Sequence, residues 1–247
     1  MPNKPDKYGM KIWILADSET KYIKNFQVYL GKIGSESQKD LGKNVVMDLS
    51  SCLQPGHNIT VDNFFCSYSL GQQLLKKNLT LLGTIRKNRH EVPKSYAKTK
   101  DRELYSSIFA FTDTTTLVSY LAKKSKIVLL LSTMHHDNNV QEDEKRKPEM
   151  ILDYNKTKVG VDVADQMMKH YSVKRATRRW TLALFYNFID MAALNAYIVW
   201  SYCHGKDKRR HFLESLINEL KEKYMTKRSA KRVQPLPSTS SSTEPTR

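Results

Sequence analysis

Hydrophobic and polar positions alternate with changing periods along the first third of the chain. An apolar run at residues 11–16 and an alternating aromatic and β-branched run at 22–30 each predict a β-strand, and the two strands are expected to pair. Apolar residues at helical spacing over 38–52 predict an amphipathic helix. The same criteria predict a strand at 58–65, a helix at 67–77 and a strand at 79–85. This order of strands and helices is typical of an α/β fold.

Beyond residue 86 the pattern changes to short strands and then to long helices. The predicted elements are strands at 105–111, 117–121 and 127–131, a surface loop at 138–148, and helices at 158–170, 180–202 and 210–224. The three strands form a β-rich insertion. Residues 235–247 are rich in Pro, Ser and Thr without apolar periodicity, which predicts a disordered tail.

The most apolar stretch, residues 182–200, is long enough to be compared with a membrane span. It contains Asn187, Asp190 and Asn195. A carboxylate at the middle of a span costs about 2.5–3.5 kcal/mol on insertion scales. A buried core helix is therefore predicted, and no membrane is expected among the partners.

The charge balance narrows the class of partner. The chain has 41 Lys and Arg against 25 Asp and Glu, a formal net charge of +16, which favours a polyanion and nucleic acid in particular. The alternative is a basic protein without such a partner. The chain has three cysteines, Cys52, Cys66 and Cys203, and they form no CxxC pair. They exclude a cysteine zinc site and fit a reducing compartment, either cytosol or nucleus.

Four acids stand where carboxylates can carry chemistry. Asp17 ends the first predicted strand, and Asp62 stands at the end of a later one. Asp162 and Asp165 are three residues apart in a predicted helix, so they share one face. Carboxylates of this kind can converge on Mg²⁺ or Mn²⁺, and two such ions clamp the attacking and leaving oxygens of a phosphodiester. The alternative is that these acids are helix caps and turn residues.

Two basic segments are candidates for phosphate contacts. Arg86, Lys87 and Arg89 follow the strand 79–85, where a solvated charged loop is an equal alternative. The second segment stands before Trp180, which is expected to pack in the core, and its cations are Lys174, Arg175, Arg178 and Arg179.

Two further groups are not expected to carry chemistry. His135 and His136, followed by Asp137, are neighbours in a loop and seldom converge on one metal ion. Cys66 has no base beside it in the local sequence, so it is not expected to act as a nucleophile.

Six segments appear in a characteristic order over roughly residues 10–225. The first three acids lie in KIWILADSETKYIKNFQVYLGK, GHNITVDNFFCS and KPEMILDYNKTKVGVDVADQM. The other segments are GTIRKNR, VSYLAKKSKIVLLLSTMHHD and RRWTLALFYNFIDMAALNAYIVW. Together they resemble the piggyBac transposase family, including the piggyBac-derived domesticated proteins.

The resemblance implies an RNase H-like catalytic core with a β-rich insertion, followed by C-terminal helices. It makes Asp17, Asp62 and Asp162 the catalytic ligands of two Mg²⁺ or Mn²⁺ ions, with Asp165 as a further catalytic acid. DNA cleavage and strand transfer at TTAA, a nuclear location and a homodimer in the full-length family context are implied, without a small-molecule substrate. The expected divisions are the first part of the core at 1–87, the insertion at 88–150, the second part of the core with the C-terminal helices at 151–228, and a disordered tail at 229–247.

The chain also departs from the family's pattern. It begins about ten residues before the first acid segment, lacks the cysteines of a C-terminal zinc-binding domain, and has Val159 where the family has Gly. A truncated copy, a fragmentary gene model and a domesticated core would each explain this. Two functions are therefore expected: a DDE transposase catalytic domain, or a domesticated or decayed remnant that binds DNA or chromatin without catalysis.

Overall fold

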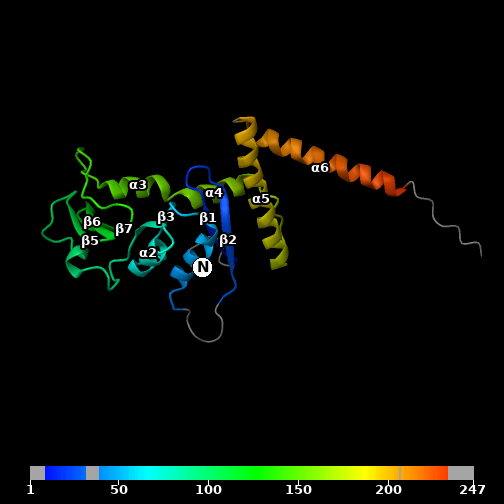
Figure 1. The fold of residues 1–247 in the computed structure, drawn as a ribbon. Helices are drawn as coiled ribbons and strands as arrows, with labels where there is room; N and C mark the ends of the chain where they lie inside the picture. Colours follow the sequence, from blue (N-terminus) through cyan, green and yellow to red (C-terminus); the bar gives the residue numbers. More distant parts are fainter. Residues whose placement is uncertain (1–8, 32–38, 206, 233–247) are drawn as a thin grey trace, which may run out of the picture. The chain divides into compact units, whose positions relative to one another are not determined.

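The computed structural model describes residues 9–31, 39–205 and 207–232, which form a mixed α/β fold (Figure 1). The main elements are β1 (Lys11–Ala16), β2 (Ile23–Tyr29), α1 (Leu41–Leu49), β3 (Asn58–Val61), α2 (Tyr68–Leu75), β4 (Thr80–Thr84), β5 (Ser107–Thr112), β6 (Thr115–Lys123), β7 (Lys126–Ser132), α3 (Glu149–Thr157), α4 (Gly160–His170), α5 (Trp180–His204) and α6 (Arg209–Arg232). The chain divides into two compact units, Met1–Leu194 and Asn195–Arg247, and the border falls within α5.

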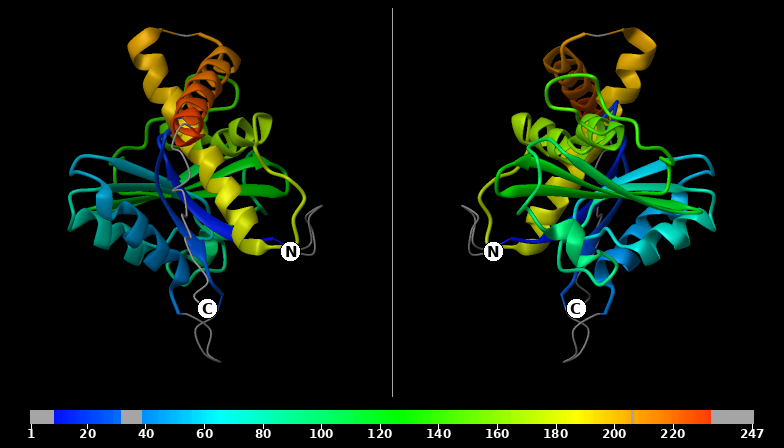
Figure 2. Two further views of the ribbon diagram at one scale, coloured as in Figure 1. Left: turned by 90° about the vertical axis from the view of Figure 1, so that its right-hand side faces the viewer. Right: turned by 90° about the vertical axis from the view of Figure 1, so that its left-hand side faces the viewer.

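The described strands form two sheets. β1 and β2 are an antiparallel pair, and the other five strands follow the order β3-β4-β7-β6-β5. In this larger sheet β3 and β4 are parallel, and the remaining neighbours are antiparallel. In both views of Figure 2 the blue pair runs across the direction of the green strands. The predicted order of elements through residue 85 is confirmed, and the predicted β-rich segment continues the sheet of β3 and β4 through β7.

Alternating side chains of the larger sheet enter two separate cores, because successive residues of a strand face opposite sides. Leu131 of β7 lies in one core with Leu74 of α2. Its neighbour Leu130 lies in the other core with Met150 of α3. Helices α2 and α3 therefore cover opposite faces of the sheet.

An aromatic cluster attaches β1 to the rest of its unit. Buried Trp13 stacks on Phe64 with ring centroids 5.5 Å apart and meets Phe65 edge-on at 5.2 Å. Val45 of α1 packs in the same cluster. Because both phenylalanines closely follow Asp62, the cluster holds β1 beside the turn that begins with this acid.

Helix α3 occupies a segment where the sequence predicted no helix. Its buried residues are Met150 and Ile151, so the apolar stripe is too short to produce a helical period. Pro148 stands directly before the first turn, and its carbonyl accepts a hydrogen bond from the Ile151 N–H.

Helix α5 is less buried than the sequence predicted. In its most apolar 18-residue window only 22% of the residues are buried, and Trp180 is 63% exposed. The predictions of a buried core helix and of a core position for Trp180 are therefore wrong: the apolar side chains that suggested a core are in large part exposed. Within the described residues, α5 is the one helix long and apolar enough, by length and composition, to cross a membrane.

The second unit contains the end of α5 and the whole of α6. Gly205 has a φ of 82° and ends α5. Buried Phe212 of α6 contacts the rings of Tyr197 and Trp200, with centroids 5.8 and 5.4 Å apart. Helix α6 reaches Arg232, beyond its predicted end at 224, so residues 229–232 of the predicted tail at 229–247 are helical. The rest of that tail, including 235–247, lies outside the described residues.

Candidate active site

Asp17 is the first residue after β1 and begins a tight turn. Its Oδ1 accepts hydrogen bonds from the backbone N–H of Glu19 at 3.1 Å and from the N–H and hydroxyl of Thr20 at 2.6 and 2.7 Å. Partial burial raises the pKa of the Asp17 carboxyl, but these hydrogen bonds and the charge of Lys21 outweigh it and hold the pKa below its ordinary value. The carboxylate is therefore ionised at neutral pH.

Asp62 is the first residue after β3, which ends at Val61 and is shorter than predicted. Its Oδ1 accepts a hydrogen bond from the Phe64 N–H at 2.8 Å. Its carbonyl accepts hydrogen bonds from the N–H groups of Phe65 and Cys66. These bonds turn the chain at Asp62 and leave its side chain exposed to solvent.

Asp162 lies in the first turn of α4, and Asp165 lies one turn later; both are exposed. The helix begins at Gly160, where an added Cβ would lie 3.2 Å from Ser18 Cα, so α4 begins against the turn of Asp17. Val159 before it has a φ of −87°, which any residue adopts, and the missing family glycine therefore causes no strain here.

The acids surround two adjoining cavities. Asp62 and Asp162 line a cavity of about 300 Å³, and Asp17 lines its neighbour of about 510 Å³. The residues common to both walls are Leu15, Ile59, Thr60, Lys158 and Val161. The structure thus brings Asp62 and Asp162 to one cavity and Asp17 to the adjoining one, while Asp165 lines neither.

Tyr154 of α3 lies on the wall shared with Asp62 and Asp162. Burial raises the pKa of its phenol, and the charges of these two carboxylates raise it further. Both carboxylates therefore lie near enough to the Tyr154 hydroxyl to influence its ionisation.

Two of the acids carry donor groups of the kind that hold a metal ion. Asp62 and Asp162 offer exposed carboxylate oxygens, which suit a hard divalent cation such as Mg²⁺. Among the described residues, however, no group of three or more His, Cys, Asp or Glu side chains is assembled that could hold a metal ion. The donor chemistry of Asp62 and Asp162 suits a divalent cation, and Asp17 does not join them as a third ligand in this arrangement.

The comparison that decides the family covers most of the chain. The family model described as Transposase IS4 matches residues 1–197. The chain belongs to the piggyBac-type transposase family. Membership of this DDE transposase family implies the use of a divalent metal.

Individual relatives of this piggyBac-type chain are longer than it is. It is 25% identical over 195 residues to the PiggyBac transposable element-derived protein 3 of Homo sapiens, covering 72% of this chain and 33% of that protein. The Chimeric ERCC6-PGBD3 protein of Homo sapiens also matches at 25%, covering 72% and 18%. A cryo-EM structure of the piggyBac transposase synaptic complex with hairpin DNA superposes with a TM-score of 0.85 and 38% identity, covering 92% of this chain and 49% of that chain.

In this piggyBac-type chain, the first predicted basic segment adjoins the second acid. The Nε of Arg86 donates a hydrogen bond to Asn63 Oδ1 at 3.1 Å, and its guanidinium lies 5.9 Å from the Phe64 ring centroid. Arg86 therefore lies beside the turn of Asp62. Lys87 is exposed and Arg89 is partly buried on the same loop.

The second basic segment, Lys174 to Arg179, lies between α4 and α5, and its four predicted cations are exposed. A buried carboxylate ties its base to α5: Asp190 is 5% exposed and accepts hydrogen bonds from the Ser172 hydroxyl and the Val173 N–H. The acid that argued against a membrane span thus holds this segment in place.

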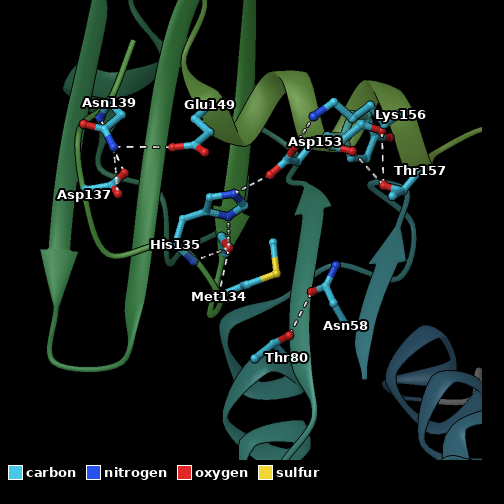
Figure 3. Close-up of polar contacts among 12 residues, drawn as sticks. Asn58, Thr80, Met134, His135, Asp137, Asn139, Glu149, Asp153, Lys156 and Thr157 are labelled. Carbon is cyan, nitrogen blue, oxygen red and sulfur yellow. Dashed lines mark hydrogen bonds and ion pairs between the residues drawn. The ribbon is translucent and has the colours of Figure 1, made fainter. Parts of the chain in front are cut away.

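Figure 3 shows how α3 is fixed to the end of β7. The ring of His135 contacts Ser132 Oγ through Nδ1 at 2.9 Å and Asp153 Oδ2 through Nε2 at 3.1 Å. Burial raises the pKa of Asp153, but hydrogen bonds from Lys156 and His135 outweigh it and keep the pKa below its ordinary value. His135 therefore acts as a link between β7 and α3.

Cys66 is fully buried beside the second acid. Burial raises the pKa of its thiol to about 12, so the thiol is neutral at physiological pH. This agrees with the expectation that it is no nucleophile.

Tyr154 and Lys158 were missed by sequence reasoning. Tyr154 lies in α3 and Lys158 directly follows it, and α3 has little apolar periodicity. The available signal was their place in the family-like segment that also contains Asp162. Hydrogen bonds of α3 to the sheet, from Thr157 to Thr60 at 2.8 Å and from Tyr154 to Thr84 at 3.5 Å, bring them to the site.

Proposed function

We propose that this chain is the catalytic domain of a piggyBac-type DDE transposase, with an RNase H-like core that cleaves and transfers DNA strands at TTAA. The observation that carries the proposal is the pair of exposed carboxylates, Asp62 and Asp162, on one cavity, with Asp17 on the adjoining one. Metal-dependent nicking of a TTAA-flanked duplex, and its loss in Asp62→Asn, tests the proposal. The chain spans about a third and about half of its matched relatives, so activity of a whole transposase is not implied.

We assign separate tasks to the chain's own residues in this proposal. Asp62 and Asp162 would hold the metal, with Asp17 and Asp165 as the further proposed acids of the site. When bound, Mg²⁺ or Mn²⁺ supplies Lewis-acid stabilisation of the oxygens around phosphorus. Exposure of the carboxylates leaves a duplex free to approach. Arg86, beside Asp62, would contact the DNA backbone there.

A second function, DNA or chromatin binding without catalysis, is favoured by a specific observation. Among the described residues no group of three acids is assembled for a metal. Two of the matched relatives are proteins of Homo sapiens, and one is named as transposable element-derived. In both functions the proposed partner is DNA and the proposed location is the nucleus, with a homodimer in the full-length context.

Binding to duplex DNA is expected to depend steeply on salt. Each phosphate that a Lys or Arg neutralises contributes about −0.9 to the slope of log K against log salt, because counterions are released. Replacing Lys174, Arg175 and Arg178 by Ala should make this slope shallower by up to about 2.7. Fluorescence anisotropy at several salt concentrations measures the slopes.

The matched control removes the same charge elsewhere. Lys123, Lys124 and Lys126 are exposed on the β6–β7 hairpin, and their replacement by Ala should change the slope by less than about 1. Equal effects of the two triple variants would contradict the assignment of the 174–179 segment to DNA contact.

Gly160→Ala is expected to lower strand cleavage about 10-fold without lowering thermal stability. An alanine Cβ would lie 3.2 Å from Ser18 Cα, so the start of α4 must shift by a few tenths of an ångström. A 1 Å misplacement of a reacting group can cost about 100-fold. Ala favours a helix over Gly by about 1 kcal/mol, which protects the fold. Single-turnover cleavage and thermal denaturation test this; unchanged cleavage would show that the contact does not position Asp162.

A further inference from the structure

We propose that Lys158 is a catalytic residue that donates a hydrogen bond to the scissile phosphate, an inference that rests on the proposed function of DNA strand cleavage. Lys158 directly follows α3, and its backbone N–H donates to the Tyr154 carbonyl at 2.9 Å. It lines both cavities, and of the described residues common to the two walls it alone carries a charge. It therefore stands between Asp17 on one side and Asp62 with Asp162 on the other.

The charge of Lys158 is free to meet a ligand. It is the one cation among the described residues that line the cavity of Asp62 and Asp162. Within the described residues it forms no ion pair, whereas Lys156, two residues earlier, is paired with Asp153 at 2.9 Å (Figure 3). A phosphodiester entering between carboxylates is repelled, and an unpaired ammonium offsets that repulsion.

The ring of Tyr154 lies beside this ammonium. Lys158 Nζ lies 5.8 Å from the centroid of the Tyr154 ring, within the range of a cation–π interaction. The ring itself is held by partial burial and by the contact of its hydroxyl with Thr84. A fixed aromatic face restricts where the ammonium can lie, which keeps it at the cavity wall.

The proposed role involves no proton transfer by Lys158. The oxygen of a water molecule or a 3′-hydroxyl forms a bond to phosphorus, and its proton passes to solvent. The bond from phosphorus to the leaving oxygen breaks, and that oxygen keeps the electron pair and is protonated by solvent. Lys158 keeps its three protons and donates one hydrogen bond to a nonbridging oxygen, where negative charge is greatest.

The experiment compares Lys158→Ala with Lys156→Ala, which removes the same charge two residues away. Lysine acylation is measured with and without a TTAA-flanked duplex, and cleavage is measured in single turnovers at saturating DNA. We expect DNA to protect Lys158 strongly and Lys156 little. We also expect Lys158→Ala to lower the cleavage rate about 100-fold, with Lys156→Ala near the wild-type rate. Lys158→Arg should recover part of the rate, because guanidinium also donates to phosphate.

The outcomes separate this inference from the proposed function. Cleavage that is lost in Asp62→Asn but equal in the two lysine variants would overturn the role of Lys158 alone. Cleavage that survives Asp62→Asn would overturn the proposed function. If the wild-type chain binds DNA without cleaving it, the acylation measurement tests the phosphate contact. Selective protection of Lys158 by DNA supports this contact. Equal protection of Lys158 and Lys156 overturns it.

Discussion

Asp62→Asn is expected to reduce metal-dependent nicking of a TTAA-flanked duplex by at least about 100-fold. The amide oxygen can still accept the hydrogen bond from the Phe64 N–H, so the turn after β3 is preserved. What is lost is the negative charge on the cavity shared with Asp162, and with it the attraction for a divalent cation. Nicking is measured on a labelled duplex with Mg²⁺ or Mn²⁺ and again after chelation.

The control for this variant is Asp113→Asn. Asp113 is exposed in the turn between β5 and β6 and lines neither cavity. The nicking rate of Asp113→Asn should stay within about twofold of the wild-type rate, since surface substitutions away from a site change the fold little. Nicking that persists in Asp62→Asn would place the activity at a different site or in a contaminating nuclease and would contradict the proposed function. Equal losses in both variants would point to general damage.

Leu130→Ala is expected to lower the free energy of unfolding by about 2–5 kcal/mol. Leu130 is fully buried in the centre of β7, in the core that the sheet forms with Met150 and Ile151 of α3. Truncation removes apolar contacts and leaves a cavity that the surrounding strands can only partly fill. Urea unfolding followed by circular dichroism measures the change.

Leu104→Ala is the matched substitution at the surface. Leu104 is 46% exposed, so its truncation should cost less than about 0.5 kcal/mol. If Leu130→Ala lowered the free energy of unfolding as little as Leu104→Ala, a tightly packed core beneath α3 would be contradicted.

Much of the secondary structure could be predicted from the local spacing of apolar residues. The burial of each helix and strand could not be predicted in this way. The apolar run predicted as a strand at 11–16 coincides with β1, because the whole strand is marked by its apolar residues. Helix α3 has two buried residues and produced no period. For α5 the apolar composition indicated a helix, but burial depends on which surfaces pack against it, and that information is not local.

The candidate site, too, could be predicted from the sequence only in part. Asp17 and Asp62 could be placed at strand ends, since an acid that ends an apolar run is visible in the sequence. Their distribution over two cavities depends on how α4 begins against the turn of Asp17. Tyr154 and Lys158 reach the site through contacts between residues far apart in the chain, which no local pattern contains.

The bond from Val173 to Asp190 also has a dynamic consequence. The Val173 N–H lies at the base of an exposed basic segment, yet its acceptor is a buried carboxylate. Its amide hydrogen can exchange with solvent only when this bond opens, by a local motion that need not unfold the sheet. Hydrogen exchange at this one amide therefore measures the free energy of opening of the segment, separately from global unfolding. If DNA contacts this segment and restrains it, exchange at Val173 will slow while exchange in the core strands keeps its rate.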